Sequence, residues 1–214
     1  KFIGPVDYQV VWDSDYFVIR QGWNSWTRRT FYCKNYTTPL DTVITSVCDL
    51  DYFIAGSHRA LTAYYTEPNL VPYLKREPDF INVGIANKKT PHDWSGRYIP
   101  IGNELIGHPL LIYAKDDVGH KSSKIGMQAT FHELGHASHY WVNPVYYLTK
   151  YEARTKEMES WANGVAYAYA RALLGEEYEW NDHYSEVYTR LVESLLMNGF
   201  TMEQIQSDFY VSDG

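Results

Sequence analysis

An α+β fold is predicted for this chain, because short β-prone runs fill its first half and longer helical patterns fill its second half. A length of 214 residues suits one domain with a sizeable core. Apolar residues make up 45% of the chain and charged residues 21%, which is typical of a globular protein and argues against disorder. We expect residues 1–75 to be an N-terminal β-prone and helical segment of the same domain, with its core in residues 76–214.

The N-terminal segment begins with two β-prone runs, at residues 9–12 and 16–20, that are separated by acidic and serine residues. This pattern predicts a hairpin or a pair of edge strands. Between residues 42 and 66 the apolar positions fall near helical spacing, and Pro68 ends the pattern. We therefore expect at least one helix after the strands.

Three further β-prone runs, at residues 80–85, 97–101 and 110–114, are separated by Pro, Gly and Asn-Lys-Lys turn material. Their short length and close spacing predict a small mixed sheet. This sheet would lie directly before the helical half of the chain.

Two long helices are predicted next. Ser122 or Ser123 can cap a helix over residues 124–141, which Asn143-Pro144 would end. The second helix should cover residues 155–174, because Gly175 provides a typical C-terminal stop.

Two more helices are expected at the C-terminus, over residues 182–197 and 202–208. The second would begin at Thr201, since Thr201 and Gln204 have the spacing of a capping box. The helical half of the chain thus holds four predicted helices.

Charge excludes two classes of partner. With 19 Lys and Arg against 26 Asp and Glu, the net charge of -7 offers no basic surface for a nucleic acid or an anionic membrane. No apolar run approaches the roughly 18 residues that a membrane span needs, so no span is predicted.

The compartment is predicted from weaker signals. Cys33 and Cys48 could form a local disulfide, which requires an oxidising compartment, or could be two buried free thiols. The given sequence begins at Lys1 rather than Met and does not open on a basic-then-apolar run, so we expect either a mature product or a piece of a longer protein. We expect a secreted, periplasmic or cell-surface protein.

A metal-binding motif lies inside the first long predicted helix, as His132-Glu133-Leu134-Gly135-His136. Residues four apart stand on the same helix face, so both imidazoles can reach one metal ion. Glu133 is placed to contact a water on the metal rather than the metal itself. Two alternative interpretations, a structural metal site and two surface histidines, are less favoured. Structural zinc sites prefer thiolate ligands, and no Cys is near the motif.

A third ligand is expected from the next helix, because a catalytic zinc has three protein ligands and one open position. Glu159 is the preferred candidate, and Glu157 and Glu152 remain alternatives. Asn163 stands four residues after Glu159 on the same face, so its oxygen could accept a ring N–H from a ligating histidine.

These two motifs resemble the gluzincin branch of the zincin-like zinc metallopeptidases, which carry His-Glu-x-x-His on one helix and a glutamate ligand on the next. The matching residues here are Phe131 to Ala137 and Glu159-Ser160-Trp161-Ala162-Asn163. The resemblance covers roughly residues 110–175, and Asn163 replaces a frequent Asp. The metzincin branch is disfavoured, because Val142 stands where its third histidine would fall.

The resemblance implies a zinc-dependent peptidase that acts on a peptide or protein substrate. His132, His136 and Glu159 would bind Zn²⁺, and Glu133 would act as general base and then general acid. A tyrosine donor is also implied, and Tyr151 is preferred over Tyr146 and Tyr147, which could instead pack under a loop.

The resemblance further implies an edge strand that pairs with an extended substrate, with residues 110–114 as the candidate and a core strand as the alternative. His139 is expected to pack beside the cleft rather than bind metal. His183 is a weaker candidate for binding the oxyanion.

Two other functions remain open. Seven Trp and 20 Tyr could build stacking surfaces for a glycan on a non-catalytic, zincin-like binding module. The chain could also be a structural module of a larger secreted protein. An intact Glu133 argues against the binding module, because a scaffold without catalysis has no need for a general base.

Overall fold

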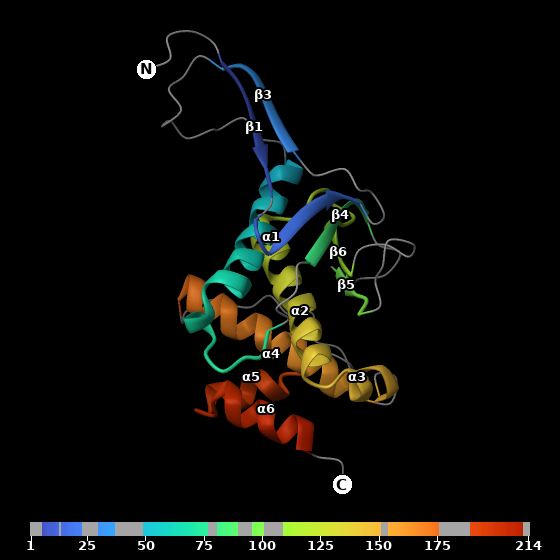
Figure 1. Cartoon of the computed structure of the whole chain (residues 1–214), viewed down its shortest axis with the longest axis vertical. Coiled ribbons are helices and arrows are strands. Elements are labelled where there is room, and N and C mark those ends of the chain that lie inside the picture. Colours follow the sequence, from blue (N-terminus) through green and yellow to red (C-terminus); the bar gives the residue numbers. More distant parts are fainter. Residues whose placement is uncertain are drawn as a thin grey trace.

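The computed structural model describes residues 6–12, 14–22, 30–36, 49–76, 81–89, 96–100, 109–150, 154–175 and 189–211. In this part of the chain the fold is α+β, as predicted: a four-stranded mixed sheet lies beside a layer of helices (Figure 1). A separate two-stranded sheet extends from one end of this body, and the C-terminal helices lie at the opposite end (Figure 1).

The four-stranded sheet has the order β2-β4-β6-β5. Strands β2 (Phe17–Gln21), β4 (Ile81–Lys89) and β6 (Leu110–Lys115) run parallel, and β5 (Gly96–Tyr98) runs antiparallel to β6. Central parallel strands need cover on both faces, and residues on both faces of β4 and β6 are buried accordingly. The predicted small mixed sheet is therefore confirmed.

Of the two arrangements predicted near the N-terminus, the hairpin is wrong and the pair of edge strands is confirmed, because β1 (Val6–Val11) and β2 each lie at an edge of a different sheet. Strand β1 pairs antiparallel with β3 (Thr30–Tyr36), whereas β2 pairs in parallel with β4 and forms an edge of the main sheet. The physical reason is burial: successive residues Phe17, Val18 and Ile19 are all buried, so both faces of β2 need cover that a hairpin with β1 would not give.

The expectation that residues 110–114 form an edge strand is also wrong. Strand β6 pairs with β4 on one side and β5 on the other, so its hydrogen-bonding groups are used on both sides. Among the described strands, β5 forms this edge of the sheet. The two β-prone runs on either side of residues 101–108 pair with each other as β5 and β6. The sequence alone did not indicate which strands would be partners.

The helical layer begins with α1 (Asp49–Thr66), which is followed by the short 3₁₀ helix η1 (Pro68–Leu70). Helix α1 packs so closely on the next long helix that a Cβ placed on Gly56 would lie 1.8 Å from the carbonyl oxygen of Ser123. Glycine is needed wherever two helix backbones approach this closely. The predicted helix before Pro68 is confirmed.

The two predicted long helices are confirmed within one residue at each end. Helix α2 (Ser123–Val142) begins at Ser122, whose hydroxyl accepts the Ile125 N–H, and α4 (Thr155–Leu174) ends at Gly175 with a φ of +95°. The short helix α3 (Pro144–Lys150) joins them.

Two C-terminal helices, α5 (Leu191–Met197) and α6 (Met202–Val211), complete the described chain. The predicted capping box begins α6, since the Thr201 N–H donates to Gln204 Oε1 and the Gln204 N–H donates to Thr201 Oγ1. Helix α5 confirms the final turns of the helix predicted over residues 182–197, whose first part, residues 182–188, lies outside the described residues.

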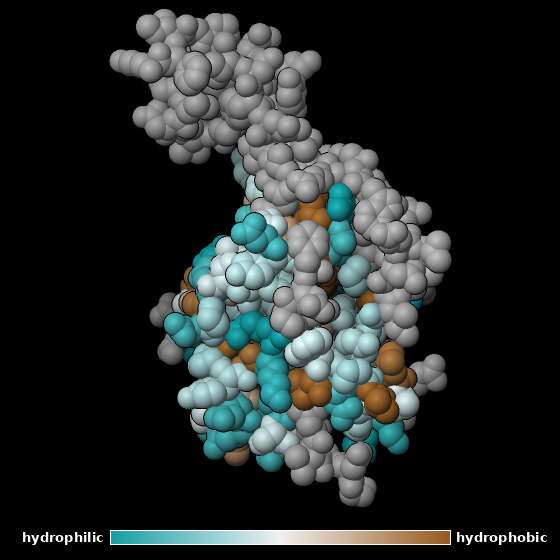
Figure 2. All heavy atoms as spheres, in the orientation of Figure 1, coloured by the Kyte–Doolittle hydropathy of each residue, from teal (hydrophilic) through white to brown (hydrophobic). Residues whose placement is uncertain are grey.

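The core joins the sheet to α1, α2 and α4, and it holds large side chains that are fully buried, such as Phe17, Phe53, Phe131, Trp161 and Tyr169. Figure 2 shows that the described surface on one face is mostly teal and white, with separate brown groups. No helix in the described part of the chain combines the length and the apolar character that crossing a membrane would demand.

Candidate metal centre

Helix α2 places two imidazoles side by side. His132 and His136 are one turn apart, and their ring centroids are separated by 4.9 Å. His136 is buried with 4% of its side chain exposed, whereas His132 keeps 15%. The pair is thus enclosed by protein on the His136 side and reachable from solvent at His132.

Helix α4 brings a carboxylate to the same point. Glu159 Oε2 lies 3.0 Å from His132 Nε2 and 3.4 Å from His136 Nε2. Of the residues that the structure describes, these three form the one group whose ligand atoms could hold a metal ion, and these atoms lie within 4.8 Å of one another.

The spacing of these atoms fits a small divalent cation. Two ligands that are each about 2.1 Å from a tetrahedral zinc lie about 3.4 Å apart. The two separations involving Glu159 are 3.0 Å and 3.4 Å. Two imidazole nitrogens and one carboxylate oxygen also form a donor set that suits Zn²⁺, although imidazole and carboxylate bind other transition metals as well.

Asn163 orients the first histidine. Its Oδ1 lies 2.8 Å from Nδ1 of His132, and a carbonyl oxygen accepts hydrogen bonds without donating, so Nδ1 carries the proton. The lone pair of a neutral His132 is then on Nε2, the nitrogen that faces Glu159. This is the orientation that a metal ligand needs.

The charges of the cluster depend on one another. Burial alone would lower the pKa of His132, but the Glu159 carboxylate outweighs burial and raises this pKa to about 9. Burial would raise the pKa of Glu159, and the two histidines reverse this effect and hold the pKa well below its usual range. The buried carboxylate is therefore stabilised by positive charge beside it, which either a proton or a metal cation can supply.

Glu133 lies beside this cluster without belonging to it. Its side chain is buried, and burial raises the pKa of its carboxyl group. The charges of His132 and His136 and the backbone N–H of Tyr98 act in the opposite direction. A second carboxylate is thus held next to the candidate metal site, as the motif predicts.

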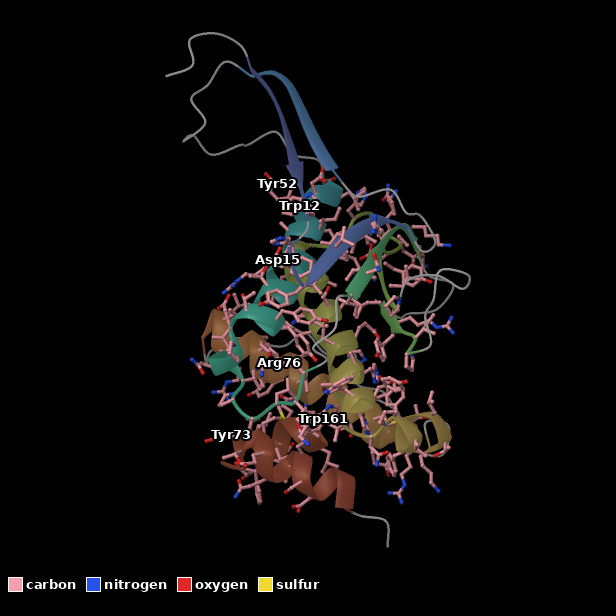
Figure 3. All side chains as sticks on the ribbon, in the orientation of Figure 1. Trp12, Asp15, Tyr52, Tyr73, Arg76 and Trp161 are labelled. Atoms are coloured by element: carbon pink, nitrogen blue, oxygen red, sulfur yellow. The ribbon has the colours of Figure 1, made fainter. Side chains whose placement is uncertain are left out.

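The α2–α4 interface fixes the distance between the ligands. A Cβ placed on Gly135 would lie 2.7 Å from the Cα of Ala162. The Nε1–H of Trp161, which is labelled in Figure 3, donates to Ser138 Oγ at 3.1 Å. Gly135 was not singled out as a site residue from the sequence. The available signal was a glycine within a helix, which lowers helix stability by about 1 kcal/mol and often marks close packing.

His139 packs beside the centre, as predicted, and is not part of the metal-binding group. Its buried ring contacts Tyr146, Tyr147 and Trp161, with centroid separations of 6.1, 5.4 and 6.4 Å. Burial, aided by the charge of His136, lowers the pKa of His139 to about 3, so this ring is neutral.

The three tyrosines between the ligand helices have different positions. Tyr147 is buried with its ring 6.2 Å from that of His136, whereas Tyr146 is half-buried and stacks on His139. Tyr151 lies outside the described residues, so its role remains a prediction.

The other candidates from the sequence are placed as follows. Glu157 faces away from the centre, as predicted: 43% of its side chain is exposed, and its carboxylate is 4.0 Å from Arg154. Glu152, His183 and Cys48 lie outside the described residues, and so does the side chain of Cys33.

No family model, no curated protein and no solved structure matches this chain. The interpretation of the centre therefore depends on its own residues and their geometry.

Proposed function

We propose that this protein is a zinc-dependent peptidase of the gluzincin type. The observation that carries the proposal is the position of Glu133, a buried carboxylate that adjoins the His132–His136–Glu159 group without belonging to it. A site that served binding or structure alone would have no need for this second carboxylate.

The proposed zinc ligands are His132, His136 and Glu159, with Asn163 holding His132 in the required tautomer. Bound zinc would polarise the scissile carbonyl and lower the pKa of a water molecule to about 7. Three protein ligands leave one tetrahedral position for water or substrate.

Glu133 would act as the general base. Its carboxylate would take a proton from the attacking water and pass it to the leaving nitrogen of the cleaved peptide bond. Because burial raises the pKa of this carboxyl, Glu133 is a stronger base than an exposed glutamate. The water attacks directly, so this chemistry needs no covalent intermediate with the protein.

The substrate would lie along β5. The Ile99 N–H donates to the Pro109 carbonyl, and because pairing alternates along an antiparallel strand, the N–H of Tyr98 points away from β6. This N–H reaches Glu133, so the outer edge of β5 adjoins the proposed base. An extended peptide that added to this edge would pass close to the metal centre.

The proposal is tested by metal analysis of the purified protein, followed by a quenched peptide library with and without chelator. We expect one zinc per chain and cleavage that the chelator abolishes. Glu133→Gln should retain zinc and reduce kcat/KM at least about 100-fold. Glu157→Gln is the matched control, because it alters an exposed glutamate of α4 and should leave turnover unchanged.

Three results would contradict the proposal. Hydrolysis that persists in Glu133→Gln would exclude Glu133 as the base. One zinc per chain without cleavage of any peptide would favour a non-catalytic binding module. Iron in place of zinc would also argue against a peptidase, since two histidines and one carboxylate are the ligand set of non-haem iron oxygenases.

A further inference from the structure

Two residues of β5 face Glu133, and each affects its carboxylate differently. Gly96 and Tyr98 are two positions apart on the strand, so their side-chain positions share one face, which is buried. Arg97 between them is exposed on the opposite face. The buried face lies against α2.

Gly96 leaves space that Glu133 occupies. A Cβ placed on Gly96 would lie 2.7 Å from both Cγ and Oε1 of Glu133 and 3.0 Å from Cδ. Real Cβ atoms almost never approach other atoms this closely, so any larger residue at position 96 would displace the glutamate side chain. An isolated glycine within a strand often marks such a close approach.

Tyr98 supplies a donor to the same carboxylate. The Ile99 N–H donates to the Pro109 carbonyl, and hydrogen bonding alternates along an antiparallel pair, so the Tyr98 N–H points away from β6, beyond the edge of the sheet. This N–H donates to the carboxylate of Glu133. A backbone donor in a strand is fixed in direction, so it restrains the carboxylate more firmly than a mobile side chain could.

We propose that Gly96 and Tyr98 are positioning residues that hold the general base: Gly96 by leaving room for its side chain and Tyr98 by donating its backbone N–H to the carboxylate. The inference rests on the proposed peptidase function for its catalytic meaning. The edge strand then has two roles, since the strand that would bind substrate also sets the direction of Glu133. A base must lie within about 3 Å of the proton it removes, so this restraint matters for the rate.

The hydrogen bond is tested without any assay of turnover. In ¹⁵N-labelled protein, Glu133→Ala should move the Tyr98 amide proton signal upfield and speed its exchange with solvent, because the N–H loses a charged acceptor. Glu157→Ala is the control and should leave the signal in place. A Tyr98 signal that is the same in wild type and Glu133→Ala would overturn the proposal.

The role of Gly96 is tested by kinetics. Gly96→Ala should lower kcat about 100-fold, since a shift of about 1 Å in a catalytic group can have this effect, while KM and zinc content stay unchanged. Glu157→Gln is the control, because it changes an exposed side chain that faces away from the centre, and it should retain full kcat. A Gly96→Ala variant with wild-type kcat, or one that loses zinc and kcat together, would overturn the positioning role.

The two experiments separate this inference from the peptidase proposal. If no peptide is cleaved but the Tyr98 signal responds to Glu133→Ala, the contact stands and the peptidase function fails. If cleavage depends on Glu133 but the Tyr98 signal does not respond, the peptidase function stands and the positioning role fails. If Gly96→Ala does not fold, the amide experiment still decides.

Discussion

Gly135 of α2 packs directly against Ala162 of α4, so closely that a Cβ on Gly135 would lie 2.7 Å from the Ala162 Cα. Gly135 immediately precedes His136, one of the proposed ligands, and Ala162 lies between Glu159 and Asn163. The contact therefore sets the separation of the two helices at the level of the proposed metal. Backbone atoms line it, so it cannot adjust by rotating a side chain.

Gly135→Ala should weaken metal binding, because the added methyl group would push α2 away from α4 and lengthen the distances from the histidines to Glu159. We expect a loss of affinity of about 10-fold or more, similar to the effect of altering groups that support metal ligands. Overpacking should also lower the free energy of unfolding by about 1–3 kcal/mol. Chelator competition and denaturant unfolding of the metal-free protein measure the two effects.

Gly164→Ala provides the matched control. A Cβ there would lie 2.1 Å from Val192 Cγ1, so it would disturb the contact of α4 with α5 instead. This variant should lose stability and keep its metal affinity. Equal losses of affinity in the two variants would show that general destabilisation, and not the helix separation, explains the effect.

Much of the centre could be predicted from the sequence because its residues lie on two regular helices. The four-residue spacings of His132 and His136 and of Glu159 and Asn163 fix their shared faces, and the helix ends were marked by Ser122 and Gly175. The contacts of Gly96 and Gly135 could not be predicted, because they depend on which other element packs against each glycine. A glycine has no side chain whose size or polarity would indicate that neighbour.

Strand pairing was harder to predict than helix position. β-prone runs indicate where strands form but not which strands pair. Strand β2 pairs with β4, which is distant in sequence, and the sequence between β5 and β6 does not indicate that these two strands are neighbours. The hairpin error followed from assuming that neighbouring runs pair. The burial of three successive apolar residues at 17–19 was the available signal for a covered strand.

Asn163 should tune metal affinity through the proton of His132. Asn163→Leu removes the acceptor that lies 2.8 Å from Nδ1 and should weaken metal binding about 10-fold to 100-fold. Asn163→Asp keeps an acceptor and adds a negative charge, so it should bind metal at least as tightly as wild type. Chelator competition at fixed pH measures both, and an Asn163→Leu variant with wild-type affinity would contradict the role.

His139 should make the metal-free protein sensitive to acid. The pKa of this ring is lowered from 6.5 to about 3 in the folded protein, so the unfolded chain binds a proton below pH 6.5 that the folded chain does not. The contribution of His139 to stability is therefore full above pH 6.5 and falls as the pH drops towards 3, by up to about 1.4 kcal/mol for each pH unit. Unfolding in chelator at several pH values should give a shallower decline for His139→Phe than for wild type. Parallel curves would contradict this role of His139.

Arg76 should be a main determinant of stability away from the metal centre. Its guanidinium donates to the hydroxyl of Tyr169 at 2.9 Å and to three carbonyl groups of the loop after α1, so it ties this loop to α4 (Figure 3). Burial raises the pKa of Tyr169 to about 12, although Arg76 acts in the opposite direction, so the phenol remains a neutral acceptor.

Arg76→Met should lower the free energy of unfolding by about 3 kcal/mol, because four acceptors, three of them in part-buried hydrogen bonds, lose a charged donor at once. Arg76→Lys should recover little of this loss, since an ammonium group cannot reproduce the planar fork of donors. Arg59→Met is the matched control: its ion pair with Glu67 is exposed and should contribute less than about 1 kcal/mol. Denaturant unfolding of the metal-free proteins ranks the three variants, and equal losses for Arg76→Met and Arg59→Met would contradict the assignment. Metal affinity should be unchanged in all three, because Arg76 bonds α4 at Tyr169, which lies ten residues after Glu159 along the helix.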